Sequence, residues 1–293
     1  MWRDHDPSVA SVALPCHPFH AARRRRLRMP DAFFLPFHQR HLLGALVRRE
    51  LAARHRASLL GALWFWIAPL LALGVYAFVF GGVLATRLPG QASPGWAGFA
   101  LVLFSGLALA TFFNEVLGRA PGSVLAHPGY VKKVVFPLHL LACVDASAAL
   151  VTLGASLALV VAAAAATGGL AITSLALPLV VAPLVPMTLG LAWAVAALGV
   201  YLRDLSAMVP PALTALVFLA PVMYPRESVP EAARQWMVLN PLTVPVEQLR
   251  RVLFLGEWPD LHALGIYAVA SLVVYFWGFA VFRRLMKGFA DVL

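Results

Sequence analysis

Charged residues are scarce in this sequence: Asp, Glu, Lys and Arg together make up 12% of its 293 residues, whereas 61% are hydrophobic. A soluble domain of this length needs about twice that density of charge to cover its surface. The composition therefore excludes a soluble globular protein and predicts an all-α integral membrane protein.

Lysine is rarer still, because Lys132, Lys133 and Lys287 are the only three in the chain. None of them follows the glycines of a GxxxxGK(S/T) loop, the motif that cradles nucleotide phosphates. No spacing of Ser, His and Asp suggests a catalytic triad either. We therefore expect a protein that is not an enzyme and that holds no nucleotide or other cofactor of its own.

Cysteine occurs only at Cys16 and Cys143, so no disulfide framework is indicated. The stretches CHPFH (Cys16–His20) and HQRH (His38–His41) contain metal-ligand residue types, but the surrounding sequence is irregular. We expect these histidines to be incidental and the chain to hold no metal.

Uncharged apolar runs predict six membrane-spanning helices, since one crossing needs about 20 residues. Gly168 and Gly169 supply the turn between the third and fourth spans. The predicted spans are one between Arg56 and Arg87, one at about Trp96–Asn114, two within Ala146–Leu202, one at Leu205–Pro225 and one at Leu261–Phe282.

The net charge of +10 is explained by this topology. With the N-terminus inside, 18 of the 23 Lys and Arg fall in inner segments, which is the bias that sets orientation. Both termini are thus predicted to be cytoplasmic.

We interpret residues 1–28 as a disordered basic leader, 29–57 as a cytoplasmic segment and 58–293 as the membrane domain. An alternative interpretation of the leader is that Ala21–Arg28 form a patch that binds anionic lipid or nucleic acid.

Residues Arg40–Arg56 have helical periodicity, with Leu43, Leu46, Val47 and Leu51 on one face. Arg48 and Arg49 lie elsewhere on the helix. This pattern predicts an amphipathic interfacial helix along the inner membrane surface that leads into the first span.

A short polar segment, Pro121–His139, connects the second and third spans on the inner side. Its prolines at 121, 128 and 137 predict at most two helical turns around Ser123–His127. Taken alone, this segment is either an ordinary positive-inside loop or a docking surface.

The outer segment Arg226–Asp260 is too polar to span a membrane. The sequence SVPE (Ser228–Glu231) predicts a capping box at the start of a first helix, and a second helix, about Val244–Leu255, ends at Gly256. A re-entrant hairpin of this kind is tolerated where protein or a water-filled path covers it, so it indicates transport.

Aromatic residues are dense in the first two spans, where they either anchor and pack the helices or form a path on which sugars stack. Asp145 lies near the start of the third span, where an ionisable group is costly. We favour a structural role for it near the inner face, either hydrated or paired with His139 or a lysine.

Several motifs occur in an order that resembles the permease subunit of ABC-2 type polysaccharide exporters, the group that exports O-antigen, capsule and teichoic acid. They cover the chain from about Arg40 to its end. The motifs are RHRASLLGALW (Arg54–Trp64), VKKVVFP (Val131–Pro137), YLRDL (Tyr201–Leu205), PVMYP (Pro221–Pro225), LNPLT (Leu239–Thr243) and FADVL (Phe289–Leu293).

The resemblance implies a homodimer of permeases in the bacterial inner membrane, with two separate ATPase subunits that bind ATP and Mg. It implies a lipid-linked glycan as substrate and no nucleic acid partner. The implied coupling residues are Gly122, Ser123, His127, Tyr130, Lys132 and Lys133, and the implied outer gate is Ser228, Glu231, Asn240, Pro241 and Glu247.

On this hypothesis a lipid diphosphate is attracted at the inner face by Arg48, Arg49, Arg54 and Arg56. The glycan then slides past aromatic rings, for which the candidates are Trp64, Trp66, Tyr76, Phe80, Phe112 and Tyr224. Two alternatives are an ABC-2 exporter of a drug or lipid and a membrane glycosyltransferase or ligase. The latter is disfavoured because Arg87–Trp96 contains no acidic residue.

Overall fold

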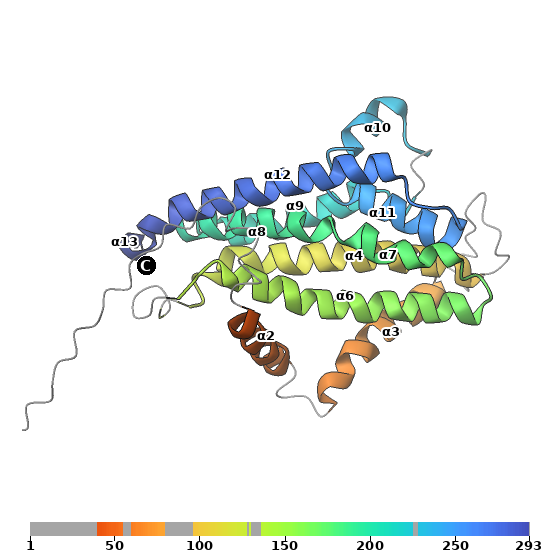
Figure 1. The fold of residues 1–293 in the computed structure, drawn as a ribbon, viewed down its shortest axis with the longest axis horizontal. Coiled ribbons are helices and arrows are strands. Elements are labelled where there is room, and N and C mark those ends of the chain that lie inside the picture. The colour runs from red at the N-terminus through yellow and green to blue at the C-terminus, as the bar shows by residue number, and fades with distance from the viewer. Residues whose placement is uncertain are drawn as a thin grey trace, which may run out of the picture.

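The computed structural model describes residues 40–54, 60–79, 96–127, 129, 136–224 and 228–292, and these residues form helices and connections without any β-strand. Figure 1 shows long helices running side by side, with α2 and α3 on one flank and α10 rising from the opposite one. The α-helices are α2 (Arg40–Arg54), α3 (Trp64–Tyr76), α4 (Trp96–Ser123), α6 (Leu140–Ala166), α7 (Leu177–Val181), α8 (Leu184–Tyr201), α9 (Leu205–Leu219), α10 (Glu231–Met237), α11 (Thr243–Arg250), α12 (Leu261–Leu285) and α13 (Phe289–Val292).

Among the described residues, four helical segments are long and apolar enough to cross a membrane: Gly98–Ser123, Leu140–Ala166, Ile172–Tyr201 and Leu261–Gly288. They correspond to the predicted second, third, fourth and sixth spans. The predicted first and fifth spans coincide with shorter apolar helices, Trp64–Val79 and Leu205–Leu219. The all-α membrane class is therefore confirmed, while the count of six crossings stays a prediction.

The turn between α6 and the next span forms where the glycines predicted it. Gly168 adopts a left-handed φ of 73°. The amides of Gly168 and Gly169 donate to the carbonyls of Ala165 and Ala164. This Schellman arrangement satisfies carbonyls that the helix end would otherwise leave unpaired.

Helix α8 lies at the centre of the bundle, in contact with both α4 and α12. Glycines bring α8 and α12 close, because a Cβ at Gly278 would overlap the carbonyl oxygen of Gly190. Trp193 of α8 is completely buried, donates its indole N–H to the carbonyl of His139 at 2.9 Å and packs 5.1 Å from the ring of Phe279. Small residues and a cluster of three aromatic rings, those of Trp193, Tyr275 and Phe279, thus define the α8–α12 contact.

The inner end of α4 departs from the sequence prediction, which used Pro121 to separate a short helical piece. Pro121 instead lies inside α4, which continues to Ser123. A proline removes one backbone donor but permits a helical φ, and here α8 covers that point closely. A Cβ at Gly199 would lie within 2.8 Å of the Pro121 Cα.

The outer segment folds back into the bundle as a helical hairpin. Leu242, Val246 and Leu249 are fully buried, and α11 contacts α4, α7 and α12. The helix continues as a π-helical turn, Arg251–Leu255, and ends at Gly256, whose φ is 67°. The predicted second helix and its glycine stop are confirmed.

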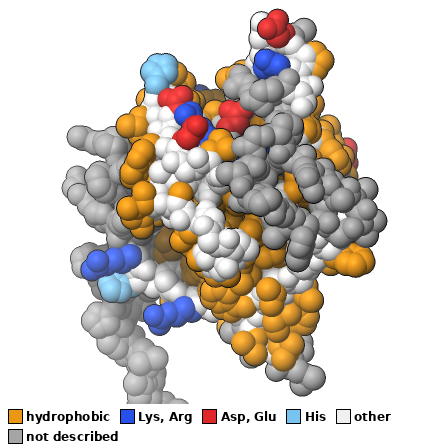
Figure 2. Space-filling view, turned by 90° about the vertical axis from the view of Figure 1, so that its right-hand side faces the viewer, with side chains coloured by type: hydrophobic (Ala, Val, Ile, Leu, Met, Phe, Trp, Pro, Cys, Tyr) orange, Lys and Arg blue, Asp and Glu red, His pale blue; other side chains and the backbone are white. Residues whose placement is uncertain are grey.

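Figure 2 looks onto the end of the bundle that lies on the right in Figure 1. Acidic and basic side chains lie next to one another in the upper part of this face, and hydrophobic side chains cover much of its lower part. Among the outer residues, Arg251 pairs with Glu257 at 3.1 Å and with Asp260 at 3.8 Å. The surface of the outer segment therefore carries ion pairs beside exposed apolar side chains such as Trp236 and Trp258, and the segment is apolar where it packs.

Candidate functional site

A groove lies between α3, α4 and α6. It contains a cavity of about 220 Å³, which adjoins a wider hollow of about 550 Å³. The cavity is lined by Ala68, Pro69, Ala72, Tyr76, Phe104, Leu107, Ala108, Thr111, Phe112, Glu115, Ala149, Thr152, Leu153 and Ser156.

Helical spacing explains why these residues share the groove. On α6, the lining positions Ala149, Thr152, Leu153 and Ser156 follow the i, i+3, i+4, i+7 pattern of one helix face. The lining residues of α3 and α4 repeat with similar spacing. Several of them are small, so the facing helices leave space between them.

The groove brings together some of the aromatic residues predicted to form a substrate path. Tyr76 and Phe112 line the cavity, and Trp64 lines the adjoining hollow. Phe104, an aromatic residue of the second span that was not among the path candidates, also lines the cavity, and its ring centroid lies 6.4 Å from that of Tyr76.

The other predicted path residues lie elsewhere. Trp66 is 49% exposed on α3 and lines neither space, because two residues along a helix turn a side chain through about 200°. The hydroxyl of Tyr224 donates to the carbonyl of Phe218 at 2.8 Å, beyond the end of α9. Phe80 lies outside the described residues.

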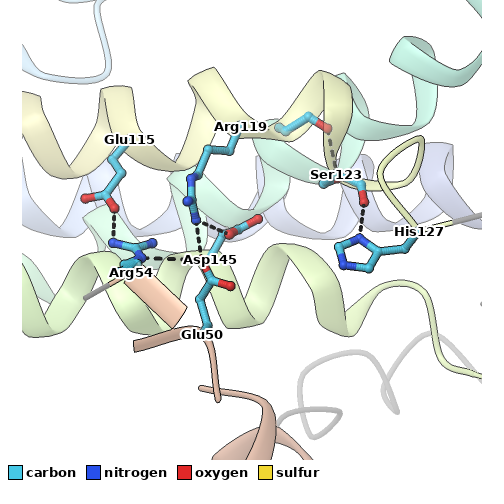
Figure 3. A network of polar contacts seen from close by, with 8 residues as sticks. Glu50, Arg54, Glu115, Arg119, Ser123, His127 and Asp145 are labelled. Atoms are coloured by element: carbon cyan, nitrogen blue, oxygen red, sulfur yellow. Dashed lines mark hydrogen bonds and ion pairs between the residues drawn. The ribbon is translucent and has the colours of Figure 1, made fainter. Parts of the chain in front are cut away.

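A chain of ion pairs joins α2, α4 and α6 at one end of the groove (Figure 3). Arg119 donates from Nη1 to Glu50 Oε1 at 2.7 Å and to Asp145 Oδ1 at 3.0 Å. Arg54 donates from Nη1 to Glu115 Oε1 and from Nε to Glu50 Oε1 at 3.4 Å. Three carboxylates and two guanidinium groups therefore alternate.

Sequence reasoning assigned no role to Glu50, Glu115 or Arg119. The sequence does contain a signal for these ion pairs. Glu50 and Arg54 are four residues apart, as are Glu115 and Arg119, and this spacing places an acid and a base on one helix face. Burial tends to raise the pKa of Glu50, but hydrogen bonds and positive charge from Arg119 and Arg54 outweigh burial and lower it below 4.5. Glu50 is therefore ionised at neutral pH.

Asp145 has a structural partner, as predicted, but the partner is Arg119 and not His139 or a lysine. His139 is buried and its ring meets Phe279 edge to face at 6.0 Å. Burial, followed by the positive charge of Arg283, lowers the pKa of His139 to about 4. His139 is therefore neutral at physiological pH and does not form an ion pair with Asp145.

The arginines predicted to attract a lipid diphosphate are divided between surfaces. Arg48 and Arg49 are exposed on α2, whereas Arg54 faces α4 and pairs with two glutamates. Arg56 lies outside the described residues. Leu43, Leu46, Val47 and Leu51 are half-buried on the face predicted to be apolar, and α2 packs against α6.

The predicted coupling segment is described only in its first part. Gly122 and Ser123 end α4, and Ser123 Oγ donates to the carbonyl of Ala120 at 2.9 Å. His127 Nδ1 lies 3.1 Å from the carbonyl oxygen of Ser123, which closes the following turn. Tyr130, Lys132 and Lys133 lie outside the described residues, so their role stays a prediction.

The predicted outer gate residues differ in their setting. Asn240 is buried and acts as a clamp: Nδ2 donates to the carbonyl of Leu216 at 2.7 Å, and Oδ1 accepts from the amide of Leu242 at 3.0 Å. The carbonyl of Pro241 accepts from Tyr267 Oη at 2.8 Å. Glu247 is half-buried on α11.

The predicted capping box is wrong. Helix α10 begins at Glu231, and Ser228 is an exposed residue that precedes it. The residue at the N-cap position is Pro230, whose ψ of 143° is not helical. Because a Ser at the N-cap must directly precede the first helical residue, Ser228 lies too early in the chain to cap α10.

Comparisons with known proteins identify the family of this chain. Residues 41–254 match the family of ABC-2 type transporters, and the chain belongs to that family. It is therefore a multi-pass membrane protein and a transport component.

The chain is 30% identical over 258 residues to the O-antigen export system permease protein RfbA of Myxococcus xanthus, covering 87% of this chain and 96% of that protein. It is 23% identical to an O-antigen export system permease protein RfbA of Klebsiella pneumoniae, covering 86% and 95% of the two chains. It is also 24% identical to the polysialic acid transport protein KpsM of Escherichia coli, covering 84% and 93%.

Proposed function

We propose that this chain is the permease subunit of an ATP-driven exporter that moves a lipid-linked polysaccharide across the bacterial inner membrane. The observation that carries the proposal is the similarity, over nearly the whole chain, to permeases named for O-antigen export and polysialic acid transport. The aromatic groove supports it, because sugar rings present apolar faces that pack on aromatic side chains.

The working exporter contains two copies of this chain and two separate ATPase subunits, which bind ATP and Mg. The inner segment Gly122–Lys133 docks on the ATPase and conveys its closure to α4. Both termini lie in the cytoplasm, in line with the bias of Lys and Arg.

Arg119 lies one helical turn before this segment, and its pairs with Glu50 and Asp145 join α2 and α6 to the same end of α4. A displacement at the inner end is thereby passed to three helices together. Through Arg54 and Glu115 it also reaches the groove.

Assembly with the ATPase is tested by co-purifying this chain with the ATPase encoded beside it. Changing Lys132→Glu together with Lys133→Glu should abolish assembly or coupled ATPase activity while the permease remains in the membrane. Lys287→Glu is the matched control, since it reverses a lysine predicted to lie on the same side of the membrane outside the coupling segment. If wild-type permease bound no ATPase, the exporter assignment would fail.

The substrate path is tested with two neighbouring tryptophans. Trp64→Ala should reduce the amount of glycan at the cell surface, because Trp64 lines the groove, whereas Trp66→Ala should have a smaller effect. Equal and undiminished export in both variants would contradict the groove as a glycan path. A drug or lipid exporter would leave surface glycan unchanged even when the whole gene is deleted.

A further inference from the structure

We propose that Glu115 binds substrate directly, by accepting hydrogen bonds from the hydroxyl groups of a neutral sugar unit held in the groove. The inference rests on the proposed function and adds to it the residue that recognises the sugar. Its starting point is position: Glu115 is the acidic residue that lines both the cavity and the adjoining hollow.

The carboxylate of Glu115 is only partly engaged. Its hydrogen bond from Arg54 uses Oε1. Oε2 accepts no hydrogen bond from any residue within the described ranges, and the side chain remains 23% exposed. Because an ionised carboxylate offers about four lone-pair sites, Glu115 can keep Arg54 and still accept hydroxyl donors.

The charge around Glu115 selects against ionic ligands. A cationic ligand would gain little attraction from Glu115, because the guanidinium group of Arg54 already offsets the charge of this carboxylate. An anionic ligand would be repelled by the carboxylate of Glu115. The carboxylate of Glu50, which pairs with the same arginine, would add to this repulsion. A neutral, hydroxyl-rich ligand has neither cost, because it donates to the carboxylate without carrying charge into the groove.

The rest of the groove suits a sugar. Tyr76 and Phe104 present aromatic surface, and Thr111 and Thr152 add hydroxyl groups. An aromatic surface for the apolar face of a ring, beside a few polar groups for its edge, is the usual composition of a site for a small polar molecule. Glu115 supplies the strongest acceptor of this set because a carboxylate accepts shorter and stronger hydrogen bonds than a hydroxyl group.

Direct contact is tested by photo-crosslinking in cells whose glycan carries a tritiated sugar. A photo-reactive benzoylphenylalanine replaces Ala68, which is exposed on α3 and lines both the cavity and the hollow, or Val273, which is 62% exposed on α12 and does not line the groove. We expect labelled glycan on the permease at position 68 and not at position 273. Label at both positions or at neither, or label displaced by tetraphenylphosphonium as a cationic competitor, would overturn the proposal.

The role of Glu115 is separated from its ion pair by three variants: Arg54→Met, Glu115→Ala and the double variant. Surface glycan is measured by immunoblot and divided by the amount of permease in the membrane. We expect Glu115→Ala to export about tenfold less than Arg54→Met, as the loss of one or two charge-assisted hydrogen bonds implies, and the double variant to be as defective as Glu115→Ala. Glu115→Gln, which keeps one acceptor oxygen, should retain intermediate export.

A purely structural role gives the opposite pattern. If Glu115 only anchors α2, removing both charges restores export to the level of Arg54→Met or above it, which would overturn the proposal. Failure of the proposed function is distinguishable, because in that case deleting the gene leaves surface glycan unchanged and the wild-type gene has nothing to complement.

Discussion

Replacing Arg119 by Met is expected to destabilise the permease by removing the cation shared between α2 and α6. Glu50 and Asp145 both accept from Arg119, and the side chain of Asp145 is only 16% exposed. Without the guanidinium group, two carboxylates face each other at the end of the groove. The cost therefore includes lost attraction and an uncompensated, largely buried charge.

The magnitude follows from the geometry. Two unit charges about 3 Å apart attract by about 1.4 kcal/mol at a dielectric constant of about 80, and by about 5.5 kcal/mol at about 20. The Arg119 side chain is 44% exposed, so solvent screens both pairs substantially. We expect a loss of about 2–4 kcal/mol, between the values for exposed and buried pairs.

Thermal unfolding of the purified permease in detergent, followed by the loss of monodisperse protein, measures this effect. A loss of about 2–4 kcal/mol corresponds to a decrease in Tm of about 5–10 °C. The control is a triple variant, Arg119→Met with Glu50→Gln and Asp145→Asn, which removes all three charges and should recover most of the loss. If Arg119→Met had the same Tm as the wild type, or if the Tm of the triple variant were as low as that of the single variant, the electrostatic reasoning would be refuted.

Three further predictions concern helix contact, a buried histidine and the outer clamp. Gly278→Ala should abolish accumulation of folded protein, because the new Cβ overlaps the Gly190 carbonyl. The pKa of His139 falls from 6.5 to about 4 on folding, so protonation favours the unfolded chain and stability should decrease as pH falls from 6.5 towards 4, by about 2 kcal/mol at pH 5. Asn240→Ala should cost about 1–3 kcal/mol and expose the outer hairpin to protease, because it leaves the buried amide of Leu242 without its acceptor.

Matched variants check each of these predictions. Gly265→Ala lies on the same helix as Gly278 but has open space around its Cβ, so it should accumulate normally. His139→Leu should flatten the decrease in Tm between pH 6.5 and 5, a window above that in which Glu50 titrates. Asn240→Asp keeps the acceptor for Leu242 and should be milder than Asn240→Ala; equal proteolysis of the two would contradict the clamp.

Much of the helical framework was predictable from local sequence. Long apolar runs predicted the four membrane-length helices of the described residues. Gly168 and Gly256 predicted turns that the structure confirms. The bounds of the second span differ from the prediction. The predicted span ends at about Asn114, whereas α4 continues to Ser123, and Glu115 pairs with Arg54, 61 residues away in sequence.

The candidate site was predictable only in part. Aromatic content of the first two spans pointed to Trp64, Tyr76 and Phe112, all of which line the groove or its hollow. Composition could not distinguish Trp64 from Trp66, because the rotation of α3 against α4 and α6 decides which side chain faces the groove. For the same reason the sequence did not predict the ion pairs of Arg119, because its two partners lie on other helices.

Sequence alone determined that this chain is a helical membrane protein, since hydropathy, charge placement and glycine positions act locally along the chain. Only the tertiary structure decided which charges pair and which helix faces enclose space. Such pairs depend on the packing of helices that are distant in sequence, and the cost of leaving a charge unpaired is set by burial, which exists only in the folded chain. The groove and its carboxylate are therefore properties of the packed helices.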